Sequence, residues 1–251
     1  MTEIAQEELE RRESIILEYG GVQPIHNPFY TLSVRYSAER AIVAFMQYDY
    51  LLTKTDDAST LISEVQEAIV HVGALSRYFW PSPGGQKKDK QQRNLRLKRG
   101  EYLKKVYKLT DNSPLADREL RNAWEHFDEK LDTYLLTQEA GYFFPTPIIG
   151  SHELADDPVG NIFKLLDPDA ECLVLLGKKF FFSPLRKEVE RLFPDIVKKV
   201  FIKIRLKKTI NALSFQFNLA VLVLVVYLSL LLYVASPLGG PYISKEHQWT
   251  F

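Results

Sequence analysis

The chain of 251 residues has very little cysteine, since Cys172 is its single copy. One thiol excludes an intrachain disulfide and a metal site built from several cysteines. An excess of one charge is also lacking, because 32 Lys and Arg balance 32 Asp and Glu. This balance excludes a globally basic nucleic-acid-binding protein and an acidic disordered tail as descriptions of the whole chain. The hydrophobic content of 46% is that of a globular protein with a sizeable core.

Several catalytic motifs are absent as well. The patterns GxxxxGK[ST], GxGxxG, HExxH and GxSxG do not occur. P-loop nucleotide hydrolysis, dinucleotide binding, zinc peptidase and α/β-hydrolase chemistry therefore lose support. The charged first residues lack the apolar stretch of a signal peptide, so we expect no cleavable leader. No metal and no cofactor is expected.

Apolar residues at three- and four-residue spacing predict a mainly helical protein. A polar helix is expected over 2–19, followed by a proline-containing linker over 22–34. Four more helices are expected at 37–55, 59–80, 91–109 and 114–138, with loops short enough for an antiparallel bundle. Ser113 is expected to cap the last of these helices, because proline suits the first helical turn that follows.

The pattern changes after Pro145. Two apolar runs at 162–166 and 172–176 flank a turn and predict a β-hairpin, and 178–182 can add a further strand. A short helix is expected from Ser183 to about Phe193. The expected organisation is an N-terminal helix and linker, a helical bundle, a hairpin-plus-helix module with a basic end, a membrane helix and a short tail, over 1–34, 35–150, 151–208, 209–238 and 239–251.

No charged residue occurs from Thr209 to Ser244, and the central stretch 219–235 is apolar on all sides. Such a stretch, extended to about 20 residues, matches the thickness of a bilayer core at 1.5 Å per residue. Six Lys or Arg precede it between 196 and 208, which places the large N-terminal part in the cytoplasm by the positive-inside rule. The sequence thus predicts a single-pass membrane helix at 209–238; the alternative is a buried element of a soluble protein.

The stretch RNAWEH, from Arg121 to His126, is the best candidate for chemistry. On a continuous helix, the apolar residues of this segment form one stripe, which consists of Leu120, Trp124, Phe127, Leu131 and Leu135. His126 lies roughly 130° from the centre of the stripe, and Arg121 lies at the opposite border of the polar face. His126 is therefore expected on the polar face, in reach of Asn122 one turn before it. An imidazole can move a proton near neutral pH, and a neighbouring guanidinium can stabilise charge on a phosphate.

Arg121, Asn122 and His126 near the start of the last bundle helix resemble the R-x4–6-H motif of HEPN-domain proteins. The resemblance covers about 37–140. It implies a dimeric, metal-independent endoribonuclease, a toxin or defence effector, in which Arg121 and His126 are catalytic and Asn122 orients them. It also implies a homodimer and, for a toxin, an antitoxin or another protein partner.

Two other interpretations of the motif remain open. HEPN-like folds include members that bind a partner without cleaving RNA. Arg121 and His126 can also be ordinary solvated residues of a charged helix face, paired with neighbouring carboxylates.

The segment 86–108 is strongly basic, with ten Lys or Arg against two Asp or Glu. Such a run can follow a phosphate backbone, and Tyr102 and Tyr107 can stack on unpaired bases. RNA contacts are therefore expected from Arg93, Arg96, Lys98, Arg99, Lys104 and Lys105. His71 is expected at the core boundary, His26 and His152 in loops without ligand partners, and Cys172 buried in a strand.

Overall fold

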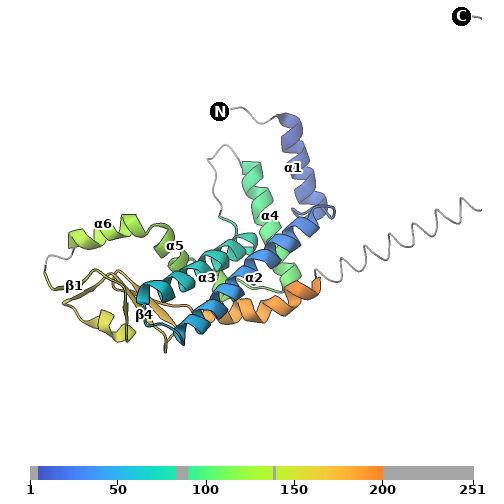
Figure 1. Cartoon of the computed structure of the whole chain (residues 1–251). Coiled ribbons are helices and arrows are strands. Elements are labelled where there is room, and N and C mark those ends of the chain that lie inside the picture. Colours follow the sequence, from blue (N-terminus) through green and yellow to red (C-terminus); the bar gives the residue numbers. More distant parts are fainter. Residues whose placement is uncertain (1–4, 83–89, 138–139, 200–251) are drawn as a thin grey trace, which may run out of the picture. The chain divides into compact units, whose positions relative to one another are not determined.

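The computed structural model describes residues 5–82, 90–137 and 140–199. This part of the chain is mainly helical, with two small sheets (Figure 1). The helices are α1 (Gln6–Tyr19), α2 (Asn27–Leu52), α3 (Ala58–Phe79), α4 (Lys90–Tyr107), α5 (Glu119–Glu125) and α6 (Phe127–Thr137), and a last helix covers 183–199. Short 3-10 turns, η1 (Pro114–Ala116) and η2 (His152–Asp156), lie between them.

The long helices α2 and α3 form the centre of the fold. Pro28 stands in the first turn of α2, where a missing N–H costs no hydrogen bond. Asp57 caps α3 by accepting the N–H of Thr60 at 2.9 Å. Their facing sides supply most of the core, with buried residues that include Val34, Ala38, Phe45, Leu61, Val65, Ile69 and Leu75.

The basic helix α4 packs between α3 and α1. Gly21 makes the close approach of α1 possible, because a Cβ at this position would lie 2.6 Å from the backbone nitrogen of Arg99. Gly21 also has a φ of 92°, which favours glycine. Asn27 then ties the start of α2 to α4 by donating a hydrogen bond to the Tyr102 hydroxyl at 3.0 Å.

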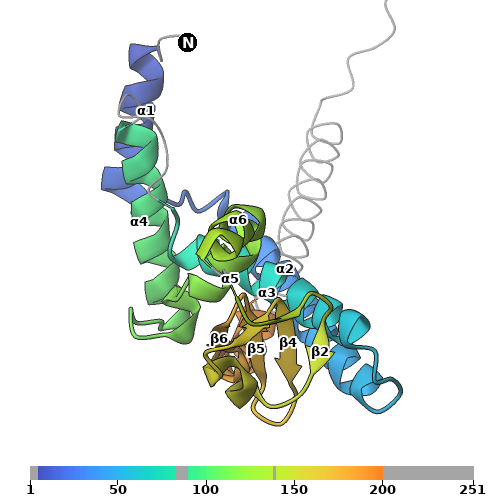
Figure 2. The ribbon, with the colours of Figure 1, turned by 90° about the vertical axis from the view of Figure 1, so that its left-hand side faces the viewer.

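The second half of the chain adds a four-stranded sheet in the order β2–β4–β5–β6 (Figure 2). Strands β4 (Lys164–Asp167), β5 (Cys172–Leu175) and β6 (Lys178–Phe181) form an antiparallel meander, and β2 (Ile148–Ile149) joins it in parallel. Leu166 and Leu173 face the helical core, whereas Leu165 and Val174 belong to a small second cluster. A separate parallel pair consists of β1 (Tyr142–Phe144) and β3 (Gly160–Ile162).

The helix over 183–199 packs on the main core, in which its residues Val189, Leu192 and Ile196 are buried. Phe182, just before it, stacks on Phe45 with ring centroids 6.2 Å apart. Arg186 binds Asp49 of α2 at 2.8 Å and Glu171 at 2.9 Å, and these carboxylates raise the pKa of its guanidinium. The last helix is thus joined to α2 by both apolar packing and charge.

The structure corrects the predicted fold class of a HEPN-like four-helix antiparallel bundle with a hairpin-plus-helix module and a membrane helix. The protein is mainly helical with small sheets, and the bundle lacks its expected fourth long helix. Within the expected range 114–138, the described residues 114–137 instead form η1, the seven-residue α5 and a separate α6. The expected linker over 22–34 is also wrong in part, because α2 already begins at Asn27.

The β module is larger than the expected hairpin. The β4–β5 hairpin and the following β6 strand are confirmed, but β1, β2 and β3 were not anticipated. None of the helices within 5–82, 90–137 and 140–199 is both long enough and apolar enough to cross a bilayer. The segment 209–238, which was expected to do so, lies outside the described residues.

A side-chain clasp joins η2 to the turn after β4. Asp167 is buried and its Oδ2 accepts hydrogen bonds from the backbone N–H of His152 at 2.9 Å and from Nδ1 of the same residue at 2.6 Å. Its Oδ1 accepts the N–H of Ala170 at 3.1 Å. Burial alone would raise the pKa of Asp167, but these hydrogen bonds outweigh it and hold the pKa below the usual value of 3.8.

We expect Asp167→Asn to lower the free energy of unfolding by about 1–3 kcal/mol near neutral pH, because charge-assisted hydrogen bonds are lost. Since the folded-state pKa of Asp167 is depressed, its contribution is present above the unfolded pKa and is lost as pH falls through the folded value. Urea unfolding from pH 7 to pH 2.5 should therefore show the two proteins converging in acid. Asp169→Asn, at an exposed position of the same turn, is the matched control. A constant difference at all pH values would contradict this account.

Candidate functional site

The three candidate residues of the RNAWEH motif, Arg121, Asn122 and His126, lie on or next to the short helix α5. The chain enters α5 through η1, where Ser113 accepts the N–H of Leu115, and Asp117 accepts the N–H of Glu119 at 2.8 Å. Leu120 and Ala123 are buried in the main core. These contacts fix α5 against α3, so the polar residues of the motif are held on a short but well-anchored helix.

The helix ends at His126, which separates α5 from α6. The His126 backbone has φ −121° and ψ 36°, and its N–H donates to the carbonyl of Asn122 at 3.2 Å. The His126 carbonyl accepts the N–H of Lys130 at 3.1 Å in the first turn of α6. The prediction of one continuous helix is therefore wrong. Leu135, expected on its core face, is 52% exposed.

The side chain of Arg121 lies between α5 and α3, rather than at the border of a polar face. Only 11% of its side chain is exposed, and it rests on α3 at Gly73. Its Nη2 donates to Oδ1 of Asn122 at 3.1 Å. Its Nε and Nη1 are buried with no hydrogen-bond acceptor among the described residues. Burial lowers the pKa of Arg121, and Glu125 partly opposes this effect.

His126 faces solvent, as predicted. Its side chain is 54% exposed, and Nδ1 lies 3.5 Å from Oε2 of Glu129. The predicted side-chain contact between His126 and Asn122 is replaced by this approach to Glu129 and by the backbone hydrogen bond. The structure thus brings Arg121 and Asn122 into direct contact, and it joins His126 to them through the helix backbone.

Further guanidinium groups surround Arg121. Arg77 of α3 and Arg118 both act on Arg121 by charge repulsion, which also lowers its pKa. Glu125 pairs with Arg77 and approaches Nε of Arg121 at 3.6 Å. Glu125 therefore lies between two guanidinium groups, and Arg118 lies nearby. The same segment also exposes the carboxylates of Asp117, Glu119, Asp128 and Glu129, so the surface carries both signs of charge. Its guanidinium groups are the part that suits an anionic ligand.

The predicted RNA-contacting residues divide into two groups. Lys98 pairs with Glu101, Arg99 donates to the Arg77 carbonyl at 3.2 Å, and Lys104 pairs with Asp111 at 2.6 Å. In the described part of the chain, no ion pair engages Arg93, Arg96 or Lys105. The bond from Arg99 to Arg77 connects the basic helix α4 with the α5 surface.

Of the two tyrosines of α4, Tyr107 does not provide a stacking platform for bases. It is 3% exposed, and burial raises its pKa to about 12. Tyr102 is partly buried and its hydroxyl accepts the hydrogen bond from Asn27. A contact between α4 and a nucleic acid would therefore depend on charge more than on stacking.

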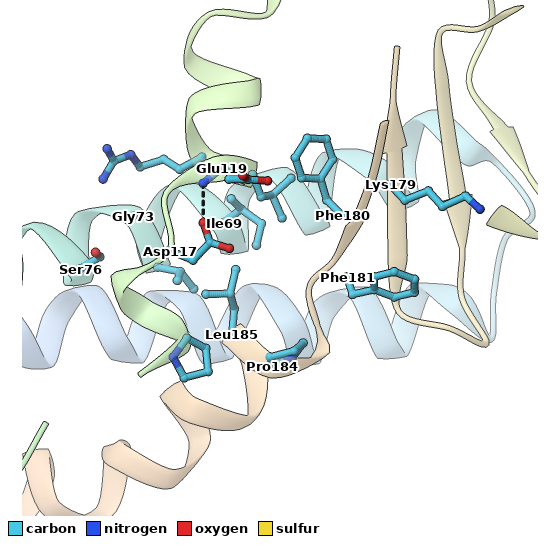
Figure 3. Close-up of a pocket in the computed structure, with 14 residues that line it drawn as sticks. Ile69, Gly73, Ser76, Asp117, Glu119, Lys179, Phe180, Phe181, Pro184 and Leu185 are labelled. Carbon is cyan, nitrogen blue, oxygen red and sulfur yellow. Dashed lines mark hydrogen bonds between the residues drawn. The ribbon is translucent and has the colours of Figure 1, made fainter. Parts of the chain in front are cut away.

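A pocket of about 250 Å³ lies beside α5 (Figure 3). Ile69 and Leu185 contribute apolar surface, while Asp117, Glu119 and Lys179 contribute charged groups, and Arg121 also lines it. Small-molecule sites typically have volumes of roughly 300–1,000 Å³. The pocket is below this range, so the candidate site is the surface of α5 rather than this cavity.

The remaining histidines and the cysteine lie outside the α5 site. His71 is partly buried on α3, which lowers its pKa, and its ring meets Tyr36 edge-on. Cys172 is buried in β5, and its thiol pKa is raised mainly by burial. His152, expected in a loop without metal-ligand partners, instead begins η2, and its ring hydrogen-bonds to Asp167. Within the described ranges, no three His, Cys, Asp or Glu side chains gather in a way that could hold a metal ion.

Comparison with protein-family models, with curated proteins and with solved structures finds no match to this chain.

Gly73 is a residue of the site that sequence reasoning missed. A Cβ at position 73 would lie 2.5 Å from Cδ of Arg121, so Gly73→Ala must displace the arginine. Helix propensity favours alanine over glycine by about 1 kcal/mol in a helix interior. We expect Gly73→Ala to be destabilising in the parent protein but stabilising when Arg121→Ala is also present. Urea unfolding of the four proteins in this double-mutant cycle measures the coupling; additive effects would show that Arg121 does not occupy this position.

Proposed function

We propose that the protein is a metal-independent endoribonuclease of the HEPN type, with its chemistry at Arg121, Asn122 and His126. The observation that carries the proposal is an exposed histidine directly after a short helix beside which three guanidinium groups lie. An imidazole that moves a proton and a guanidinium that stabilises phosphate charge can together carry phosphodiester transfer without a metal.

In this proposal, His126 accepts the proton of a ribose 2′-hydroxyl. The 2′-oxygen then attacks the adjacent phosphorus atom, the bond to the 5′-oxygen breaks, and a proton from solvent or from a second acid neutralises that oxygen. The products are a 2′,3′-cyclic phosphate and a 5′-hydroxyl. Arg77 and Arg118 stabilise the negative charge that grows on the phosphate. Arg121, whose guanidinium Asn122 fixes, is buried and adds its positive charge to the site without direct contact with the substrate.

Electrostatics supports RNA as the substrate class. The basic helix α4 is tied to the segment that carries Arg77, because Arg99 donates a hydrogen bond to the Arg77 carbonyl. Three cations of α4, Arg93, Arg96 and Lys105, carry no ion pair within the described residues, and we expect them to contact the phosphate backbone. Binding should therefore weaken steeply as salt concentration rises.

A second function is favoured by the burial of Arg121. Its guanidinium is largely covered, and two of its nitrogens face no solvent. In a binding module, Arg121 would hold α5 on α3 and His126 would be an ordinary surface residue that contacts a partner. The two functions differ in what happens to RNA when His126 is removed.

The test incubates the full-length protein with mixed single-stranded RNA in EDTA. We expect cleavage that leaves 2′,3′-cyclic phosphate ends, and we expect His126→Ala to reduce its rate by about 100-fold or more, as is usual for loss of a general base. His26→Ala, at an exposed histidine outside the site, is the matched control and should cleave normally. RNA that is bound but stays intact, or cleavage that His126→Ala leaves unchanged, would favour the binding module.

A further inference from the structure

One side of α2 carries a continuous row of large apolar side chains that stay largely exposed in the described structure, although Tyr36 also meets the His71 ring of α3 edge-on. The row begins in the turn before the helix and runs along its whole length. Its apolar members are 43–75% exposed, and they are Ile25, Phe29, Leu32, Tyr36, Val43, Met46 and Tyr50. We call this row, together with the exposed Glu39 that fills its one gap, the α2 stripe.

The spacing of the α2 stripe has a regular period. Its members follow one another at alternating intervals of four and three residues, which is the heptad repeat of a helix that pairs with another helix. At about 100° per residue, the stripe lies opposite the face of α2 that carries Val34, Ala38, Ala41 and Phe45. The helix therefore has two apolar faces, one for the core and one directed outward.

The size of the α2 stripe calls for a partner. From Phe29 to Tyr50 it extends for roughly 32 Å at 1.5 Å per residue. Its large side chains expose an apolar area on the order of 600 Å², at the upper end of what a monomer usually leaves in contact with water. Each partner in a stable protein–protein interface contributes roughly 800 Å², so one α2 stripe supplies most of an interface.

We propose that the α2 stripe binds the α2 stripe of a second copy, with the two helices antiparallel. In one antiparallel register every member of the stripe finds a member opposite, in the alternating layers of a coiled coil. The facing pairs are Ile25 with Tyr50, Phe29 with Met46, Leu32 with Val43, and Tyr36 with Glu39, and each occurs twice because the contact has two-fold symmetry.

The charge at the middle of the stripe agrees with this register. Glu39 is the single carboxylate in the row, and Arg35 on the same helix already pairs with it at 3.2 Å. Two copies would therefore not bring uncompensated negative charges together. Opposite each Glu39 lies a Tyr36 hydroxyl, which can donate a hydrogen bond to the carboxylate. A polar layer at the centre of an apolar row also fixes the register of a helix pair.

The first test is analytical ultracentrifugation of the full-length protein. We expect a dimer, and we expect Met46→Glu to weaken it at least tenfold because it places a charge in two apolar layers. Val70→Glu is the matched control, since Val70 is similarly exposed on α3 outside the stripe and its replacement should leave the dimer intact. A monomeric parent, or a dimer that resists Met46→Glu, would overturn the proposal. If the parent is a monomer that dimerises only after deletion of 209–238, that segment of the same chain covers the stripe instead.

Cross-linking tests the register directly. A disulfide needs Cα atoms within about 7 Å, and facing positions of a helix pair meet this limit. Mixed Leu32→Cys and Val43→Cys proteins should form a disulfide-linked heterodimer under mild oxidation. Neither variant alone should link to itself, because its two copies lie about 16 Å apart in this register. Self-linking of Leu32→Cys would overturn the antiparallel arrangement, and the buried Cys172 does not interfere.

This inference rests on the exposed α2 stripe and not on the homodimer that the HEPN resemblance implies. It goes beyond the proposed function, because the α2 stripe contains no residue of the Arg121 site. A protein that dimerises through the stripe but cleaves no RNA would refute the one and support the other. A protein that cleaves RNA but is a monomer would refute the dimer and support the proposed function.

Discussion

The apolar contact between α2 and α3 supports every other part of the described structure. Phe45 of α2 and Ile69 of α3 belong to one core, to which the sheet contributes Leu166 and the last helix contributes Leu192. Most buried residues of these two helices are alanine or larger hydrocarbon side chains, so the two helices pack closely and their other faces remain available for further contacts. α3 carries α5, and α2 carries the outward stripe.

The candidate site depends on the surface of α3 more than on α5 itself. A helix of seven residues has little stability of its own, and α5 is held by the burial of Leu120 and Ala123. Gly73 leaves the space that the side chain of Arg121 fills, and Arg77 provides the charge that Glu125 meets. The chemical character of the motif is thus set by a neighbouring helix about 50 residues earlier in the chain.

Local signals in the sequence were sufficient for α3, α4 and the β4–β5 hairpin, whose periodicity and turn residues agree with the structure. The start of α2 was misplaced because Pro28 was interpreted as a linker residue, although proline also fits a first helical turn. The parallel pairs β1–β3 and β2–β4 join distant segments and leave no local pattern. The motif residues were found, but neither the burial of Arg121 nor the break at His126 was, since both arise from tertiary contacts.

The position of His126 has a consequence for how stability is distributed along the chain. α5, on one side, has two buried residues, whereas α6, on the other, has none. The free energy that keeps a segment folded follows its buried contacts, so α6 opens at lower cost than α5 and exchanges its amide hydrogens sooner. His126 stands at the boundary between these two levels of local stability. The imidazole therefore follows a well-anchored helix, α5, and precedes a helix, α6, that unfolds locally at a lower cost in free energy.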